Sequence, residues 1–131
     1  MDVFERSLQL HEALRGKISV ENKMDIRTTE DLSLAYSPGV AAPCEAIHND
    51  PAKVYDYTIK GNTVAIVSDG SAVLGLGNIG PLAAIPVMEG KGMLFKRFAG
   101  INGFPICIST QKTDELIQVI RNIAPVFGGI N

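Results

Sequence analysis

The sequence predicts an α/β fold: a layered α/β/α domain with a small, mostly parallel or mixed sheet. Short β-rich apolar runs occur at residues 63–67, at 104–109 and again from 126. Segments with helical spacing of apolar residues separate these runs. Strands that alternate with helices are typical of α/β layered domains. With 131 residues, the chain is long enough for one domain with a core and too short for two ordinary ones.

The N-terminal third of the chain predicts helices and no strand. Apolar residues spaced along one face predict an amphipathic helix over residues 3–15, which ends near Gly16. Residues 17–28 are mixed and polar, so we expect an irregular segment there.

A short helix should follow, with Thr28 or Thr29 as its cap. It must stop near Tyr36, because the next residue precedes Pro38 and is pushed towards extended geometry. Residues 41–50 predict another short helix, since their proline suits a first turn.

The strand-like runs differ in character. Residues 63–67 are almost continuously apolar, which predicts a strand buried on both faces of a sheet. Residues 104–109 predict a second buried strand, and Pro105 suits only its first positions. Val126 begins a third extended piece.

Helical patterns lie between the strands, at residues 81–88, 91–99 and 114–123. The pattern breaks around Gly90 and Gly92, so the first two of these should be separate helices. Thr113 is the expected cap of the third.

Composition excludes several classes of protein. The formal net charge of −2 argues against a nucleic-acid partner held by phosphate neutralisation. No apolar run approaches the roughly 20 residues of a membrane span, and the N-terminus does not resemble a secretory signal. Cys44 and Cys107 lack paired spacing, so we expect reduced thiols in a cytoplasmic protein. His11 and His48 are isolated, so metal ligation by them is not expected.

The stretch from Ser68 to Pro81 contains the pattern G-x-G-x-x-G at Gly75–Gly80. A dinucleotide fingerprint directly follows a strand and is followed by an acidic residue about 20 positions later. Here a polar turn intervenes, and basic residues lie near the expected acidic position. A stand-alone nucleotide site is therefore the weakest of the functional hypotheses, although the proline suits the first turn of a helix.

Tyr36 and Lys91 are the candidate catalytic residues. Tyr36 precedes a rigid Ser-Pro-Gly turn, which either positions its hydroxyl as an acid or leaves it as a packing residue. Lys91 lies between two glycines, where it is either partly desolvated and a usable base or simply exposed. Asp69 and Ser71, in the turn after the first strand, suit either binding or turn formation.

Five motifs occur in one order: Tyr36-Ser37-Pro38-Gly39-Val40-Ala41, the stretch Ser68–Pro81, Ile85-Pro86-Val87-Met88-Glu89-Gly90-Lys91, Phe104-Pro105-Ile106-Cys107 and Phe127-Gly128-Gly129-Ile130-Asn131. Together they closely resemble the N-terminal domain of the small, bacterial-type malic enzymes, from about Leu8 to the end of the chain. The resemblance implies that residues 1–131 are the substrate and catalytic domain and that a C-terminal NAD(P)-binding domain is absent from this chain.

The resemblance implies oxidation of L-malate with NAD or NADP and a divalent metal (Mg or Mn), followed by decarboxylation to pyruvate and CO₂. It matches Tyr36 to the proton donor and Lys91 to the proton acceptor, which also contacts substrate. Larger enzymes of the family have an arginine that binds the substrate where this chain has Ala72, and Arg97 is the candidate for its replacement.

The family's metal ligands and nicotinamide domain lie beyond Asn131, so no metal or cofactor ligand is expected in this chain. The apolar, Gly-rich end also predicts truncation of a longer protein. We therefore expect the fragment alone to be inactive. The alternative function is a dimerisation or binding module, because family enzymes are homodimers or larger homo-oligomers.

Overall fold

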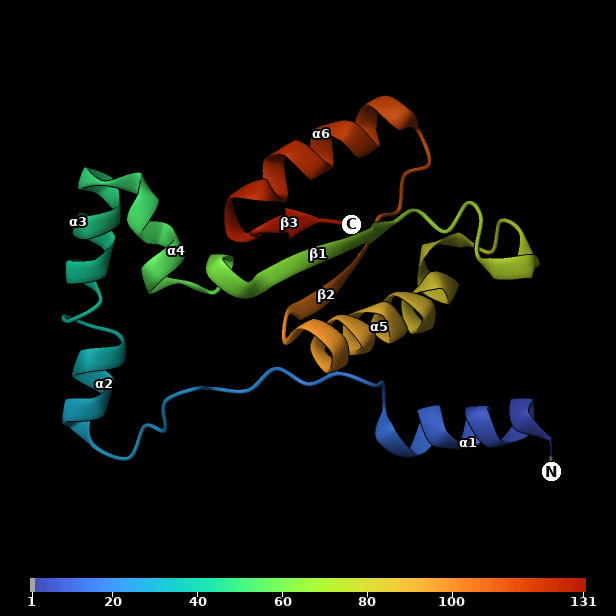
Figure 1. Ribbon diagram of the computed structural model, residues 1–131, viewed down its shortest axis with the longest axis horizontal. Helices are drawn as coiled ribbons and strands as arrows, with labels where there is room; N and C mark the ends of the chain where they lie inside the picture. Colours follow the sequence, from blue (N-terminus) through green and yellow to red (C-terminus); the bar gives the residue numbers. More distant parts are fainter. Residues whose placement is uncertain (1) are drawn as a thin grey trace.

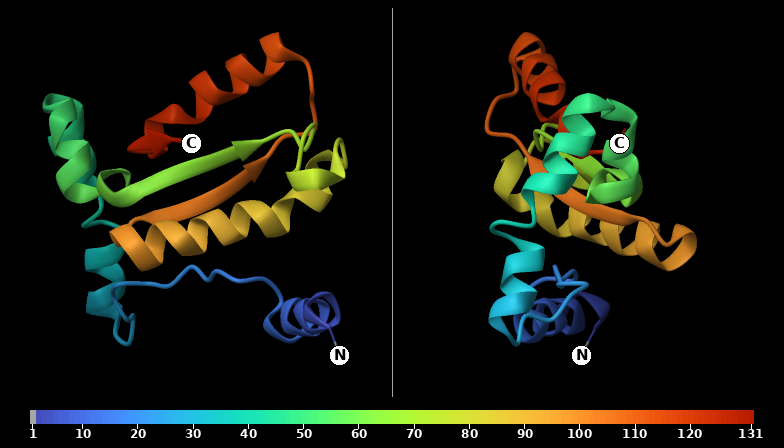
Figure 2. Two further views of the ribbon diagram at one scale, coloured as in Figure 1. Left: turned by 45° about the vertical axis from the view of Figure 1, so that its right-hand side comes forward. Right: turned by 90° about the vertical axis from the view of Figure 1, so that its left-hand side faces the viewer.

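The computed structural model of the protein describes residues 2–131. Three parallel strands form one sheet in the order β2–β1–β3, with β1 (Thr63–Ser68) between β2 (Asn102–Cys107) and β3 (Gly129–Ile130). Helix α5 (Gly80–Ala99) packs on one face, and α6 (Thr113–Ile123) lies on the other side (Figures 1 and 2). The predicted α/β layered fold is confirmed, and every strand pair is parallel.

The N-terminal elements lie outside these layers. They are α1 (Val3–Leu14), α2 (Thr29–Ala35), α3 (Ala41–Asn49) and α4 (Val54–Tyr57). Short 3₁₀ turns complete the chain at Pro51–Lys53, Ile59–Asn62, Leu74–Leu76 and Ala124–Val126. Residues 17–28 form an extended segment that runs past α5 from α1 to α2 (Figures 1 and 2). The helix over residues 3–15 and the irregular segment after it were both predicted.

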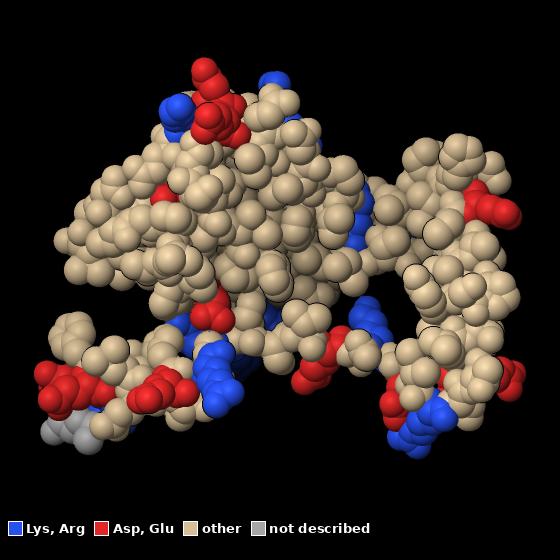
Figure 3. Space-filling view, turned by 180° about the vertical axis from the view of Figure 1, so that it is seen from behind, with Lys and Arg blue, Asp and Glu red and all other residues tan. Residues whose placement is uncertain are grey.

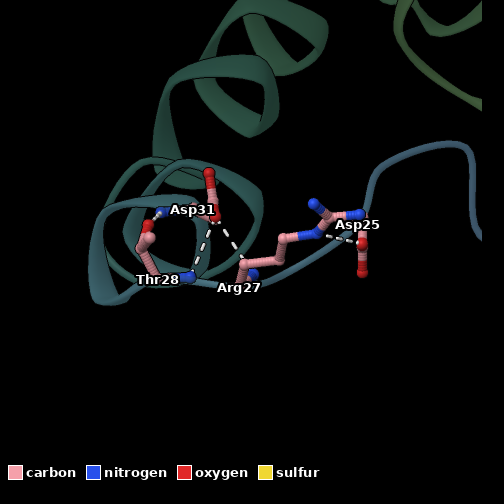
Figure 4. Close-up of polar contacts among 4 residues, drawn as sticks. All are labelled: Asp25, Arg27, Thr28 and Asp31. Carbon is pink, nitrogen blue, oxygen red and sulfur yellow. Dashed lines mark hydrogen bonds and ion pairs between the residues drawn. The ribbon is translucent and has the colours of Figure 1, made fainter.

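Local side-chain caps explain where the first two helices begin. The Asp2 carboxylate accepts from the Glu5 amide at 2.9 Å, and the Glu5 side chain accepts from the Asp2 amide in return. Thr28 and Asp31 form the same reciprocal capping box at α2, so the prediction of a threonine cap is confirmed (Figure 4). Such caps satisfy amides that have no partner inside the helix.

The predicted break around Gly90 and Gly92 is wrong, because α5 is one continuous helix through both residues. Gly92 lies directly against β2: a Cβ atom there would lie 2.7 Å from the carbonyl oxygen of Gly103. Gly103 is equally close to Gly92 in return. These glycines therefore let a helix and a strand approach backbone to backbone, and they do not end the helix.

The second strand begins two residues earlier than predicted, and Pro105 is in its interior. This is tolerated because β2 is an edge strand. The Ile108 amide donates to the Ser68 carbonyl at 2.8 Å, and alternate amides of a strand point the same way. Position 105 therefore points away from β1, so its missing N–H costs no ladder hydrogen bond.

Two further boundaries differ from the prediction. Thr113 is the first residue of α6 and not its cap; Lys112 is the N-cap, with no side-chain hydrogen bond to the helix. Val126 belongs to a 3₁₀ turn, so the third extended piece begins at Phe127 and leads into β3.

The core lies between α5 and the sheet and is small. The buried apolar side chains are Ala65, Ile66, Val73, Ala84, Met88 and Ile108. Ala65 and Ile66 are successive residues of β1 and point to opposite faces, so burial of this strand on both faces is confirmed. No residue of β2 is buried and Phe104 is 43% exposed, so the prediction of a second buried strand is wrong. Across residues 2–131, no helix is long and apolar enough to cross a membrane.

Candidate functional site

Lys91 lies in the second half of α5, and its side chain is exposed. Of the two alternatives for Lys91, the structure favours the exposed one, because both neighbouring glycines are helical and only Gly92 faces the sheet. The Lys91 ammonium donates to Oδ1 of Asn131 at 3.4 Å. Asn131 is itself held against β1, since its amide donates to the Ala65 carbonyl and its carbonyl accepts from the Val67 amide.

A shallow pocket of about 340 Å³ adjoins this pair. Its lining residues are Lys91, Leu94, Phe95, Phe98, Ala99 and Asn131. Apolar side chains form most of the surface, and the ammonium and the amide supply its side-chain polar groups. Sequence reasoning missed Asn131 as the partner of Lys91, because 40 residues separate them and only the parallel pairing of β1 with β3 brings them together.

Tyr36 is the C-cap residue of α2, and 68% of it is exposed. The turn after it contains a cis peptide bond between Ser37 and Pro38. Gly39 is required here, because a Cβ atom would lie 2.5 Å from the Ser33 carbonyl oxygen. The predicted rigid turn is therefore present.

The structure does not bring Tyr36 and Lys91 into contact. Within the described residues they share no hydrogen bond, and Figure 1 places the α2–α3 junction well away from the middle of α5. A larger groove includes neither residue in its lining. It is lined by Ala35, next to Tyr36, and by Gly92, next to Lys91.

That groove has a volume of about 1160 Å³ and lies between residues 17–26 and the α5–β2 face. Its charged lining residues are Lys17, Glu21, Lys23, Lys96 and Arg97. Figure 3 shows charged side chains of both signs along the lower, N-terminal part of the molecule and a smaller group at its top, whereas the middle of this face is largely uncharged. The groove therefore suits an anionic group, and Arg97 lines it without an ion pair to any described residue.

The Gly-rich stretch forms a closed loop between β1 and α5. Gly70 is essential to it, because its φ is +71° and a Cβ atom there would clash with the Gly80 carbonyl oxygen. The Asn78 and Gln111 side-chain amides hydrogen-bond to each other at 2.9 Å, which joins this loop to the one after β2. The first glycine of the fingerprint, Gly75, is exposed in a 3₁₀ turn and does not directly follow the strand.

Asp69 takes part in the same loop. Hydrogen bonds from the Ser71 hydroxyl and the Ser71 backbone amide hold the pKa of the Asp69 carboxyl below its usual range. The structure therefore favours turn formation over binding as the role of this pair.

No group of three or more His, Cys, Asp or Glu side chains within residues 2–131 could hold a metal ion. The residues present therefore do not fit a metal centre. Cys44 and Cys107 are both free thiols, as the sequence predicts. Burial raises the pKa of the Cys107 thiol.

The fold is a small α/β domain, a three-stranded parallel sheet with helix α5 packed on one face. The family description "Malic enzyme, N-terminal domain" matches residues 15–122. The chain is 56% identical to the bifunctional malic/malolactic enzyme of Bacillus subtilis (strain 168), over all of this chain and 32% of that protein. It is 56% identical to the NADP-dependent malic enzyme of Escherichia coli (strain K12), over 95% of this chain and 17% of that protein.

Solved structures agree. The malic enzyme from Pyrococcus horikoshii superposes with a TM-score of 0.96 at 55% identity, over 99% of this chain and 31% of that one. The chain therefore belongs to the malic enzyme family. It spans a third or less of the length of these relatives.

Proposed function

We propose that this chain is the substrate and catalytic domain of a malic enzyme that oxidises L-malate with NAD or NADP and releases pyruvate and CO₂. The observation that carries the proposal is the family match over residues 15–122, which includes both Tyr36 and Lys91. The names of the relatives include both NAD- and NADP-dependent enzymes, so the nucleotide is left open.

The reaction also needs a Lewis acid, and a bound Mg²⁺ or Mn²⁺ would polarise the C2 oxygen of malate. The described residues do not form such a centre. We therefore assign the ligands of the metal and of the nicotinamide cofactor to parts of the whole protein outside this chain, and we expect the chain alone to be inactive.

Lys91 is the proposed base. Its neutral amine would take the proton of the C2 hydroxyl as the carbon gives up its hydride. Tyr36 is the proposed acid, which would protonate the enolate carbon after CO₂ leaves. Both side chains are exposed here. The surroundings that exclude water from both side chains must therefore come from the rest of the protein or from a second copy.

A chimaera tests the assignment: residues 1–131 replace the corresponding part of the Bacillus subtilis enzyme, and malate-dependent nucleotide reduction is followed by absorbance. We expect activity, with kcat lowered about 10²- to 10⁴-fold in Lys91→Ala and in Tyr36→Phe. Lys112→Gln and Tyr57→Phe are matched controls and should stay close to the unmodified chimaera.

Near-normal kcat in either test variant would contradict the role of that residue. Turnover by the 131-residue chain alone, with malate, Mn²⁺ and NAD(P), would contradict the assignment of the missing ligands. A chimaera that folds but shows no oxidative decarboxylation of malate would contradict the proposed function itself.

A second candidate function is homodimerisation, or assembly into a larger homo-oligomer. Helix α1 buries none of its residues and exposes Val3, Phe4 and Leu8 by 69–77%. Exposed apolar surface of this kind marks interaction sites. Light scattering should show association that Phe4→Glu weakens, while a strict monomer at high concentration would argue against it.

The cellular setting completes the proposal. We infer a cytoplasmic protein without a nucleic-acid or membrane partner. The free thiols fit a reducing compartment. The net charge of −2 does not attract the phosphate groups of a nucleic acid.

A further inference from the structure

The chain turns sharply where α1 ends. Arg15 and Gly16 both have positive φ, at 54° and 102°. The Gly16 backbone lies against α5, since a Cβ atom there would lie 2.6 Å from Oε1 of Glu89. The Lys17 amide donates to the same oxygen at 3.3 Å. Glu89 therefore holds the end of this turn.

The side chain of Lys17 makes a second connection to α5. Its ammonium donates to the Pro86 carbonyl at 2.7 Å, and its Cε lies 3.8 Å from where a Cβ atom of Gly90 would be. The same ammonium lies 2.6 Å from Nε2 of His11, back on α1. Lys17 thus joins the first helix to the fifth.

This contact requires a neutral imidazole. Nδ1 of His11 lies 2.7 Å from the Ser7 carbonyl oxygen, which can only accept, so Nδ1 carries a proton. The Lys17 ammonium has donors only. Nε2 of His11 must therefore offer its lone pair to Lys17, and a second proton on the ring would remove that acceptor.

Little else holds α1 in place. No residue of α1 is buried, and its large apolar side chains are exposed. Figure 1 shows α1 at one end of the extended segment, below α5 and outside the sheet layers. The polar contacts of Lys17 are therefore a major part of its attachment.

We propose that His11, Lys17 and Glu89 form a pH-sensitive latch that holds α1 against α5 and releases it when His11 is protonated. Protonation of His11 places a positive charge beside the Lys17 ammonium. Arg15, one turn along α1 from His11, adds a third positive charge. The Glu89 carboxylate, on α5, is the opposing charge. It attracts a charged imidazole but cannot replace the lost acceptor of Lys17.

The latch is present while the His11 ring is neutral and is lost when acidification adds a second proton to the ring. The lost hydrogen bond has a charged donor. We therefore expect the ratio of docked to released α1 to fall about tenfold between pH 7.5 and 5.5.

Solution NMR of the 131-residue chain tests this directly. The readout is the nuclear Overhauser effect between the side-chain protons of residue 11 and the Lys17 ε-methylene, followed with the ring ¹⁵N shifts of His11. We expect the cross-peak at pH 7.5, its loss at pH 5.5, its return at pH 7.5, and a midpoint that matches the His11 ring.

Variants separate the charged groups. His11→Gln keeps a neutral acceptor and should hold the contact at both pH values. Glu89→Gln removes the opposing carboxylate and should still release at pH 5.5 if it docks at pH 7.5. His48→Gln, in the other histidine, should behave like the unmodified chain.

Two results would overturn the latch. One is a contact that persists at pH 5.5 while the His11 ring is charged. The other is release in His11→Gln at the same pH as in the unmodified chain. Should His11→Gln fail to fold, the unmodified chain still decides, because release must follow the charge of His11 and not that of His48.

Discussion

Replacement of Gly92 by alanine should destabilise this domain, although alanine is the better helix former. The new Cβ atom would lie 2.7 Å from the Gly103 carbonyl oxygen, and the nearest side-chain atom, Cδ1 of Ile66, is at 3.6 Å. The obstacle is backbone, so α5 and β2 must move apart. Overpacking of this kind costs about 1–3 kcal/mol, and the clash with backbone favours the upper end.

Gly90→Ala is the matched control on the same helix. Its nearest neighbour would be Cε of Lys17 at 3.8 Å, an ordinary contact. Alanine should therefore stabilise the helix there by up to about 1 kcal/mol. The same gain in helix stability applies to Gly92→Ala. After the cost of overpacking, its free energy of unfolding should be lower by about 2 kcal/mol.

Urea and thermal unfolding, followed by circular dichroism, measure both variants. We expect Gly92→Ala to lower Tm by about 8 °C and Gly90→Ala to raise it by a few degrees. If Gly92→Ala is as stable as Gly90→Ala, close packing of α5 on β2 does not explain this glycine.

Three further predictions concern single polar groups. Thr63→Val should raise the free energy of unfolding by about 1 kcal/mol in the same urea experiment, because the buried Thr63 hydroxyl has no hydrogen-bond partner among residues 2–131. Iodoacetamide should modify Cys44 at least about tenfold faster than Cys107, as mass spectrometry would show, because Cys44 is exposed and burial raises the pKa of Cys107. Hydrogen bonds from the Arg27 amide, the Thr28 hydroxyl and the Thr28 amide lower the pKa of Asp31 (Figure 4). The cap at α2 should therefore be intact above pH 3.8 and be lost as the pH falls through the lower folded value, with the Arg27 and Thr28 amide shifts as the readout. A less stable Thr63→Val would contradict the first argument, and equal rates of modification of the two thiols would contradict the second. Arg27 and Thr28 amide shifts that change well above pH 4 would contradict the third.

The sequence identifies individual candidate residues, but it does not predict how they lie relative to one another or what they contact. Tyr36 and its rigid turn follow from local sequence, since a proline and a glycine restrict the backbone there. The exposure of Lys91 and its contact with Asn131 do not, because they depend on which strand pairs with β1. The contact of His11 with Lys17 was also missed, because an isolated histidine gives no signal of its partner.

The sequence by itself determined the elements whose cause is local: the caps that start α1 and α2, the apolar run of β1 and the motifs that place the chain in its family. Only the tertiary structure decided that α5 continues through Gly90 and Gly92 and that a strand accepts Pro105. The physical reason is the same in both cases. A glycine or a proline has different consequences depending on the neighbour it faces, and that neighbour comes from a distant part of the chain.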